Sequence, residues 1–158
     1  MKAADDGQVK AVVGKTGVVD AHMDALGKGV PAGQTVYIGQ WQHALSRQGR
    51  PPIGVGKLSE DGDTVLFEGR LFDTPAGQEA RVIFKEAPPE WSLGLYVEEH
   101  SFSEKGIRNI LKASAFEVSP VTRGAMPGTK TLVVKEHNQD LEQTIAAYFA
   151  QYPRQPRG

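Results

Sequence analysis

Glycine and proline divide this chain into short apolar runs, and that division limits what it can fold into. The 158 residues include 18 glycines and 10 prolines, most of them in the first two thirds. Several runs alternate in the strand period, as around Val36 and Ile38 and around Val65 and Phe67. Short punctuated runs of this kind favour strands over long helices. The expected strands are Gln8–Val19, Thr35–Trp41, Ile53–Leu58, Thr64–Leu71, Ser92–Val97, Ala113–Val118 and Lys130–Lys135.

Local signals add one hairpin and a few helices to this pattern. Asp61-Gly62 is a hairpin turn signal between two of the expected strands. Thr74 followed by Pro75 is typical of a helix N-cap with proline at the first helical position, so we expect a helix over Ala76–Glu86. A shorter helical turn is expected over Glu104–Leu111. The predicted fold class is therefore mainly β with peripheral helices, an α+β domain.

The segment Asn138–Tyr152 differs from the rest because it carries an apolar stripe at helical spacing. The sequence leaves two interpretations open: the stripe packs against the sheet, or it forms the interface of a homodimer. The basic, proline-rich end that follows is predicted to be a flexible tail. At this length we expect a single domain over residues 1–152 and a tail over residues 153–158.

Composition and charge argue against several classes of function. The formal net charge is −1, without the concentrated basic face of a nucleic-acid binder. There are no cysteines, so disulfides, thiolate zinc sites and cysteine nucleophiles are excluded. Residues 1–6 lack the apolar core of a signal peptide, and no window reaches the apolar length of a membrane span. We expect a soluble, intracellular protein with no nucleic-acid partner, no membrane partner, no cofactor and no metal.

Three side chains offer a combination found in serine hydrolases. A serine hydroxyl is a weak nucleophile until a base takes its proton, and histidine has a suitable pKa for that base. His43 follows an expected strand that ends in Trp41, and Ser92 begins another. Glu117 lies in a third strand-like run, where an inward-facing carboxylate needs a partner that an imidazole N–H supplies. The hypothesis is a nucleophile, a base and an orienting acid held on rigid β elements.

Each of these residues also has an ordinary interpretation, and rival sites exist. His43 alone is typical of a loop histidine, Ser92 of a polar strand residue and Glu117 of a solvent-facing one. His100 is a second candidate for the third member of the triad, and Lys112 offers a Ser–Lys dyad. A further alternative is a metallohydrolase that uses Asp20, His22 and Asp24. If this segment is an extended strand, these alternate residues share one face and could bind a metal together.

Taken together, the ordered runs resemble the prohead (capsid-maturation) proteases of tailed bacteriophages, a family that shares its fold with the herpesvirus assemblin proteases. The resemblance covers roughly Val9 to Val134. Assemblins place their third triad member, a second histidine, at a similar interval after the serine, and this favours Glu117 here. Two departures are Ala44 after the histidine and Pro120 after the acid. The runs that carry the resemblance are Gln40-Trp41-Gln42-His43, Pro52–Gly56, Glu68–Thr74, Trp91–Leu95 and Phe116–Val121, followed by a loop with Pro127-Gly128.

This resemblance implies a mostly antiparallel, closed β-barrel flanked by helices, as in the herpesvirus proteases. It implies a serine endopeptidase in which Ser92 is the nucleophile, His43 the general base and Glu117 the orienter. The implied substrates are the scaffold region of a capsid protein and the enzyme's own pro-segments. The implied place of action is the assembling prohead in the host-cell cytoplasm. Assemblins act as dimers, which implies a role for Asn138–Tyr152 as the dimer interface.

The resemblance also suggests where the oxyanion is stabilised. Assemblins use an arginine-bearing loop at this relative place, and here the matching loop follows Glu117 and contains Arg123 and Gly124. The strongest non-enzymatic alternative is a catalytically silent protein of the same fold that binds scaffold or capsid protein.

Overall fold

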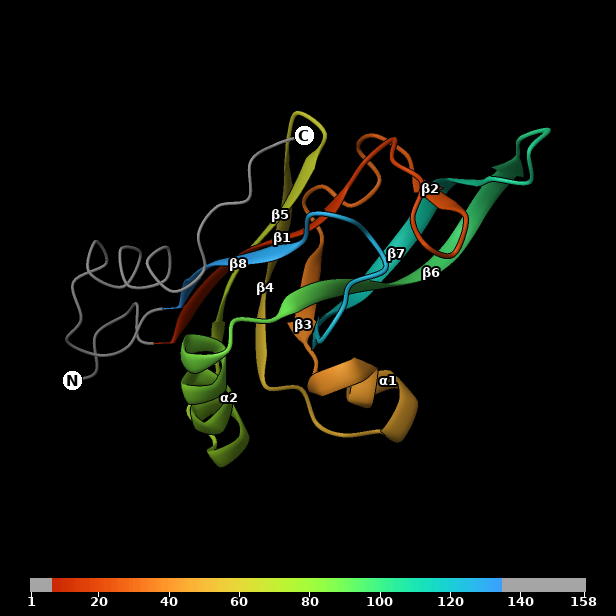
Figure 1. Ribbon diagram of the computed structural model, residues 1–158. Coiled ribbons are helices and arrows are strands. Elements are labelled where there is room, and N and C mark those ends of the chain that lie inside the picture. Colours follow the sequence, from red (N-terminus) through yellow and green to blue (C-terminus); the bar gives the residue numbers. More distant parts are fainter. Residues whose placement is uncertain (1–6, 135–158) are drawn as a thin grey trace.

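The computed structural model describes residues 7–134, and these form a curled β-sheet with short helices at one end (Figure 1). The predicted tail and the predicted helix over Asn138–Tyr152 lie outside the described residues. No helix among the described residues is long and apolar enough to cross a membrane. The elements in chain order are β1 (Gln8–Lys15), β2 (Asp24–Leu26), β3 (Thr35–Ile38), the 3₁₀ turn η1 (Trp41–His43), α1 (Ala44–Gln48), β4 (Gly54–Asp61), β5 (Thr64–Leu71), α2 (Pro75–Glu86), β6 (Glu90–Phe102), β7 (Arg108–Val121) and β8 (Lys130–Val134).

The strands form one sheet in the order β2-β7-β3-β4-β5-β1-β8, with β6 paired to β7 off this path. β7 pairs in parallel with β2 and β3, and the ladders β1–β5, β1–β8, β3–β4, β4–β5 and β6–β7 are antiparallel. The sheet curls strongly, but within the described residues no ladder joins β8 to β6 or to β2. The observed form is thus an open, curled sheet, and the expected closure into a barrel is not confirmed.

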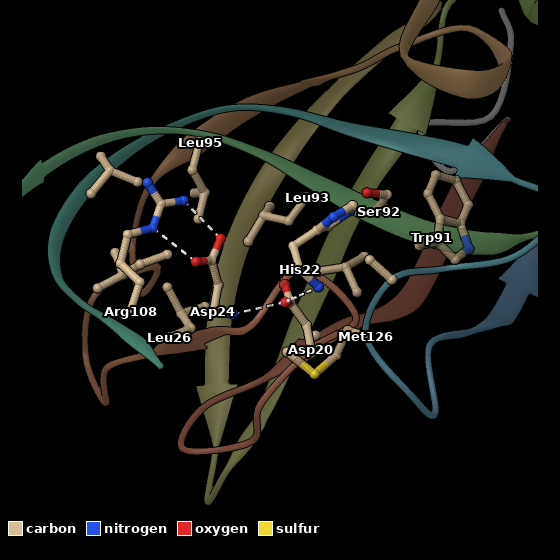
Figure 2. Close-up of a pocket in the computed structure, with 15 residues that line it drawn as sticks. Asp20, His22, Asp24, Leu26, Trp91, Ser92, Leu93, Leu95, Arg108 and Met126 are labelled. Carbon is tan, nitrogen blue, oxygen red and sulfur yellow. Dashed lines mark hydrogen bonds and ion pairs between the residues drawn. The ribbon is translucent and has the colours of Figure 1, made fainter. Parts of the chain in front are cut away.

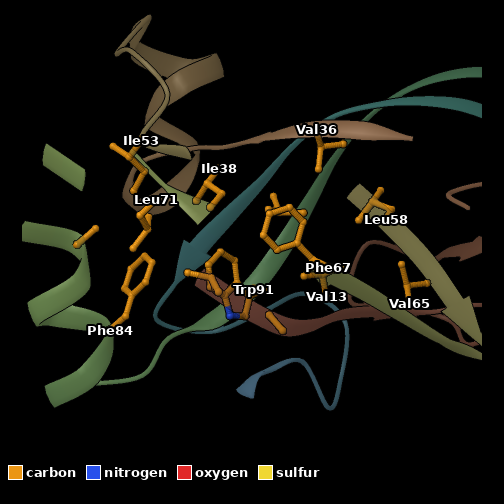
Figure 3. Packing of buried hydrophobic residues seen from close by; sticks show 14 of the residues in the cluster. Val13, Val36, Ile38, Ile53, Leu58, Val65, Phe67, Leu71, Phe84 and Trp91 are labelled. Atoms are coloured by element: carbon orange, nitrogen blue, oxygen red, sulfur yellow. The ribbon is translucent and has the colours of Figure 1, made fainter. Parts of the chain in front are cut away.

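Buried side chains from the strands and from α2 form the core (Figure 3). Phe67, Phe84 and Trp91 lie at its centre, each at most 1% exposed. The ring of Phe84 meets that of Trp91 edge-on at 5.5 Å between centroids. Trp91 is also held through polar groups: its indole N–H donates to Thr131 Oγ1 at 2.9 Å, and its backbone N–H donates to Thr129 Oγ1. Both N–H groups of this large residue are satisfied, so the position of the next residue, Ser92, is fixed by packing and hydrogen bonding.

The predicted helix after Thr74 is confirmed as α2. The Thr74 hydroxyl accepts the N–H of Gly77 at 3.2 Å, and Pro75 opens the helix, as an N-cap with a following proline requires. Ala80 and Phe84 share the buried face that lies against the core. The predicted hairpin is also confirmed, with Gly62 at φ 60° between β4 and β5.

Other sequence predictions differ from the structure. The helical turn expected over Glu104–Leu111 is wrong: a tight turn closed by the Gly106 N–H on the Ser103 carbonyl leads directly into β7. The single strand expected over Gln8–Val19 ends at Lys15, after a register shift between Val12 and Gly14. β7 continues past Pro120 to Val121, so the proline does not end the strand. β6 and β7 together form a long hairpin that projects from the rest of the sheet (Figure 1).

Candidate active site

His43 lies at the end of a short connection between β3 and α1. The backbone leaves β3 through Gly39, whose N–H donates to the Val118 carbonyl on β7 at 2.8 Å. Gln42 and His43 then adopt left-handed conformations, with φ 56° and 60°. Such angles are unfavourable for non-glycine residues, and they persist where surrounding contacts fix them. One such contact is the Gln42 Nε2 donation to Thr122 Oγ1 at 3.1 Å. The strained connection turns the imidazole of His43 back over the sheet.

Ser92 and Glu117 lie on the antiparallel pair β6 and β7. Ser92 is opposite Ser119 and Gly94 is opposite Glu117, so the serine and the acid share one face of the sheet. Glu117 is completely buried. A Cβ on Gly94 would lie 2.6 Å from Glu117 Cγ. The missing side chain at Gly94 therefore makes room for the acid.

The structure brings the three predicted side chains into one hydrogen-bonded row. His43 Nε2 lies 2.8 Å from Ser92 Oγ, and His43 Nδ1 lies 2.7 Å from Glu117 Oε1. An ionised carboxylate only accepts hydrogen bonds, so we assign the ring proton to Nδ1. Nε2 is then free to accept the Ser92 hydroxyl proton. A serine, a base and an orienting acid in this geometry form the arrangement that activates a hydroxyl for attack.

The alternative partners lie elsewhere. His100 is eight positions beyond Ser92 on β6, roughly 26 Å along an extended strand, and its ring contacts Phe102. Lys112 pairs with Glu98 at 3.5 Å on the projecting hairpin. Neither residue reaches the Ser92 hydroxyl in this structure.

The Asp20, His22 and Asp24 stretch is a turn, whereas the metal hypothesis required an extended strand. Asp20 Oδ1 accepts the backbone N–H groups of His22 and Asp24 at 2.8 and 3.0 Å (Figure 2). Asp24 pairs with Arg108 through two bonds of 2.8 and 2.7 Å, and donation from this guanidinium lowers the pKa of the Asp24 carboxyl. Within residues 7–134 no three acidic or histidine side chains are grouped as a metal site would need.

Comparison with known proteins decides the family. The family model for the caudovirus prohead serine protease matches residues 32–151, about three quarters of the chain. The chain belongs to this prohead serine protease family. The resemblance read from the sequence is thereby confirmed, and membership makes the chain a serine protease of phage capsid maturation.

Two further comparisons complete this picture. No curated protein matches the chain. One similar solved structure is described as KSHV protease in complex with a hexapeptide phosphonate inhibitor. Its identity to this chain is 13%, the match covers 89% of this chain and 69% of that one, and the TM-score is 0.48.

In this prohead protease, a pocket of about 180 Å³ opens beside Ser92 (Figure 2). Its lining includes the apolar side chains of Leu93, Leu95 and Met126, and the His22 imidazole lies beside Ser92 (Figure 2). Asp24 and Arg108 also line the pocket, and they form an ion pair in which the two charges neutralise each other. The pocket therefore presents hydrocarbon together with the polar groups of Ser92 and His22 to a bound group.

The loop expected to stabilise the oxyanion passes directly beside β6, the strand that carries Ser92. A Cβ on Gly124 would lie 2.9 Å from the Trp91 carbonyl, so only glycine allows this approach. The Gly124 N–H donates to Glu90 Oε2 at 2.5 Å. Arg123 is exposed. Among the described residues, its side chain has no hydrogen bond to the Ser92, His43 or Glu117 side chains.

Sequence reasoning missed two residues that contact the acid. Ser46 donates to Glu117 Oε1 at 2.8 Å, and Gly39 lies against Oε2. Ser46 lies three residues after His43, in the first turn of α1, and both side chains reach Glu117 Oε1. That spacing was the available signal for Ser46; the role of Gly39 depends on packing between distant segments.

Proposed function

We propose that this chain is the endopeptidase that matures the phage head, with Ser92 as nucleophile, His43 as general base and Glu117 as the residue that orients the imidazole. The observation that carries the proposal is the continuous row from Ser92 Oγ through both ring nitrogens to Glu117 Oε1, at 2.8 and 2.7 Å. Family membership supplies the reaction class. The residue assignments rest on the geometry.

The proposed reaction follows from these contacts. Ser92 Oγ transfers its proton to His43 Nε2 as the oxygen attacks the scissile carbonyl carbon. His43 then donates that proton to the leaving amine, which departs and leaves an acyl group on Ser92. A water molecule gives a proton to His43 as it attacks the ester carbon. His43 returns that proton to Ser92 Oγ as the ester bond breaks, which releases the carboxylic acid product and restores the Ser92 hydroxyl. Glu117 keeps the ring proton on Nδ1 throughout and stabilises the imidazolium.

Charge developing on the carbonyl oxygen needs donors near Ser92, and we place them in the loop that contains Arg123 and Gly124. The close approach of Gly124 to the Trp91 carbonyl supports this placement. The Gly124 N–H is engaged by Glu90 in this structure, which favours the backbone N–H of Arg123 as the first donor.

The proposed substrates are the scaffold region of the capsid protein and the enzyme's own pro-segments, cut inside the assembling prohead in the host-cell cytoplasm. The pocket beside Ser92 suggests that one residue flanking the cut has an apolar side chain, because Leu93, Leu95 and Met126 line it. A homodimer through Asn138–Tyr152 remains part of the proposal, and that segment lies outside the described residues.

The test is incubation of the purified protein and its Ser92→Ala variant with the capsid precursor, read by intact mass. Discrete fragments from the wild type alone support the proposal and give the cleavage sequence. Equal fragments from both proteins refute Ser92 as the nucleophile. No fragments from either, with the precursor retained on the protein in a binding assay, favour the silent capsid-binding alternative.

A further inference from the structure

The Ser46 hydroxyl lies beside Glu117 and has no role in the reaction proposed above. Glu117 is buried with 0% of its surface exposed, and it receives two side-chain donors on the same oxygen. His43 Nδ1 lies 2.7 Å from Oε1, and Ser46 Oγ donates to Oε1 at 2.8 Å. Within residues 7–134, no hydrogen bond reaches the other oxygen, Oε2. His43 and Ser46 therefore provide the side-chain hydrogen bonds that hold this carboxylate.

We propose that Ser46 is a positioning residue of the active site, which fixes the Glu117 carboxylate and stabilises its negative charge through a hydroxyl hydrogen bond. This inference rests on the proposed function, since it assigns Ser46 a role through Glu117 and His43. A buried carboxylate is costly unless hydrogen bonds compensate for lost water. A hydrogen bond to a charged oxygen is stronger than a hydrogen bond to a neutral oxygen. Loss of the Ser46 hydroxyl leaves Glu117 with His43 as its one side-chain donor.

The helix that carries Ser46 also explains how the hydroxyl arrives at a buried oxygen. His43 is the residue before α1, and Ser46 lies in the first turn of that helix, so both side chains approach Glu117 Oε1 from the start of α1. Ser46 itself is an exposed residue, so its hydroxyl points inward from the rim of the site. Its oxygen also lies 3.3 Å from the His43 carbonyl. A hydroxyl has one proton, and the shorter contact identifies Glu117 as the main acceptor.

Because Ser46 is exposed, its substitution leaves no buried cavity, and a change in activity can be separated from a change in folding. Ser46→Val and Ser46→Thr form a matched pair, since both side chains are β-branched and only threonine has the hydroxyl. Ser59→Ala, on an exposed position of β4, controls for loss of a surface hydroxyl away from the site.

The first measurement is steady-state cleavage of a capsid-derived peptide. We expect Ser46→Val to lower kcat about 10- to 100-fold with little change in KM, the range expected for one hydrogen bond to a charged group. Ser46→Thr should restore most of the rate, and Ser59→Ala should match the wild type. Equal kcat for the valine and threonine variants, or a loss confined to KM, overturns the proposal.

The second measurement does not depend on catalysis. In the Ser92→Ala background, the ring N–H proton resonance of His43 reports on the Glu117 contact. It should shift in Ser46→Val and stay near its original position in Ser46→Thr. An unchanged resonance in both variants overturns the role of Ser46, even when the protease is active. If the resonance shifts in Ser46→Val while the protein with Ser92 intact cleaves nothing, the Ser46 contact is supported and the proposed function is refuted separately.

Discussion

Gly39→Ala should disable the protease while leaving a folded protein. Gly39 is buried at the end of β3, and a Cβ there would lie 2.6 Å from both Glu117 Oε2 and Ser119 Oγ. Ordinary contact begins at 3.4 Å, so the acid must move by about 0.8 Å. The Cβ of Leu45 on α1, at 3.4 Å, limits escape on the other side. The added methyl group therefore acts directly on the carboxylate that holds His43.

Two magnitudes follow from this displacement. Overpacking of a buried site costs about 1–3 kcal/mol, which in a chain of this size lowers Tm by roughly 2–12 °C. A displacement near 1 Å in a catalytic arrangement costs about 100-fold in rate. We expect kcat to fall by about that factor at a temperature well below Tm, where the variant is folded.

The assay is peptide cleavage per active site, with thermal unfolding recorded for each protein. Gly14→Ala is the buried-glycine control, because the nearest atoms to its added Cβ are those of Val65 at 3.8 Å. Gly14 also lines the pocket beside Ser92, so the quantity compared is kcat at saturating peptide. Wild-type kcat in a folded Gly39→Ala protein would refute the reasoning. So would an equal loss in the Gly14→Ala control.

Three further predictions concern other contacts. Glu117→Gln should fold and keep weak activity, with kcat reduced on the order of 10⁴-fold, the effect of an equivalent amide substitution in the chymotrypsin triad; full activity would remove the acid from the mechanism. Asp24→Asn should lower stability by about 1 kcal/mol at pH 7, since the pair with Arg108 is partly exposed. Arg108 depresses the folded pKa of Asp24 below 3.8, so this difference should be present above about pH 4 and disappear as the pH falls through the folded pKa; a pH-independent difference in urea unfolding would contradict it. Thr74→Ala should cost about 1 kcal/mol through loss of the α2 cap, whereas Thr74→Ser should cost little by thermal unfolding.

Much of the fold could be predicted from local sequence signals. The Thr74-Pro75 pair and the Asp61-Gly62 turn determine backbone geometry within a few residues, and both appeared where expected. The helical turn after Ser103 was wrong because pairing with β6 overrides the weak local helix pattern. Closure of the sheet depends on ladders between strands far apart in sequence, which no local pattern contains.

The candidate site likewise combines residues that the sequence predicts with contacts that only the folded structure shows. The chemistry of histidine, serine and glutamate in separate rigid runs pointed to His43, Ser92 and Glu117, and the structure brings these side chains together. Their roles stay a proposal. The supporting contacts of Gly39 and Ser46 were not anticipated, because they arise where α1 and β7 meet in space. Gly39 carries no sequence signal for such a role, and the one signal for Ser46 is its position three residues after His43.

The short β3 ladder has a consequence for when this enzyme becomes competent. β3 pairs with β7 at two positions, Tyr37 opposite Glu117 and Ile38 opposite Val118. A slip of β3 by one residue would turn its side chains to the other face and displace the following connection, which carries His43, relative to Glu117. The two side chains are 74 positions apart, and contacts of such long sequence separation form slowly in folding. The row of hydrogen bonds is thus completed only by the native register, so a partly folded chain lacks the assembled contacts among Ser92, His43 and Glu117.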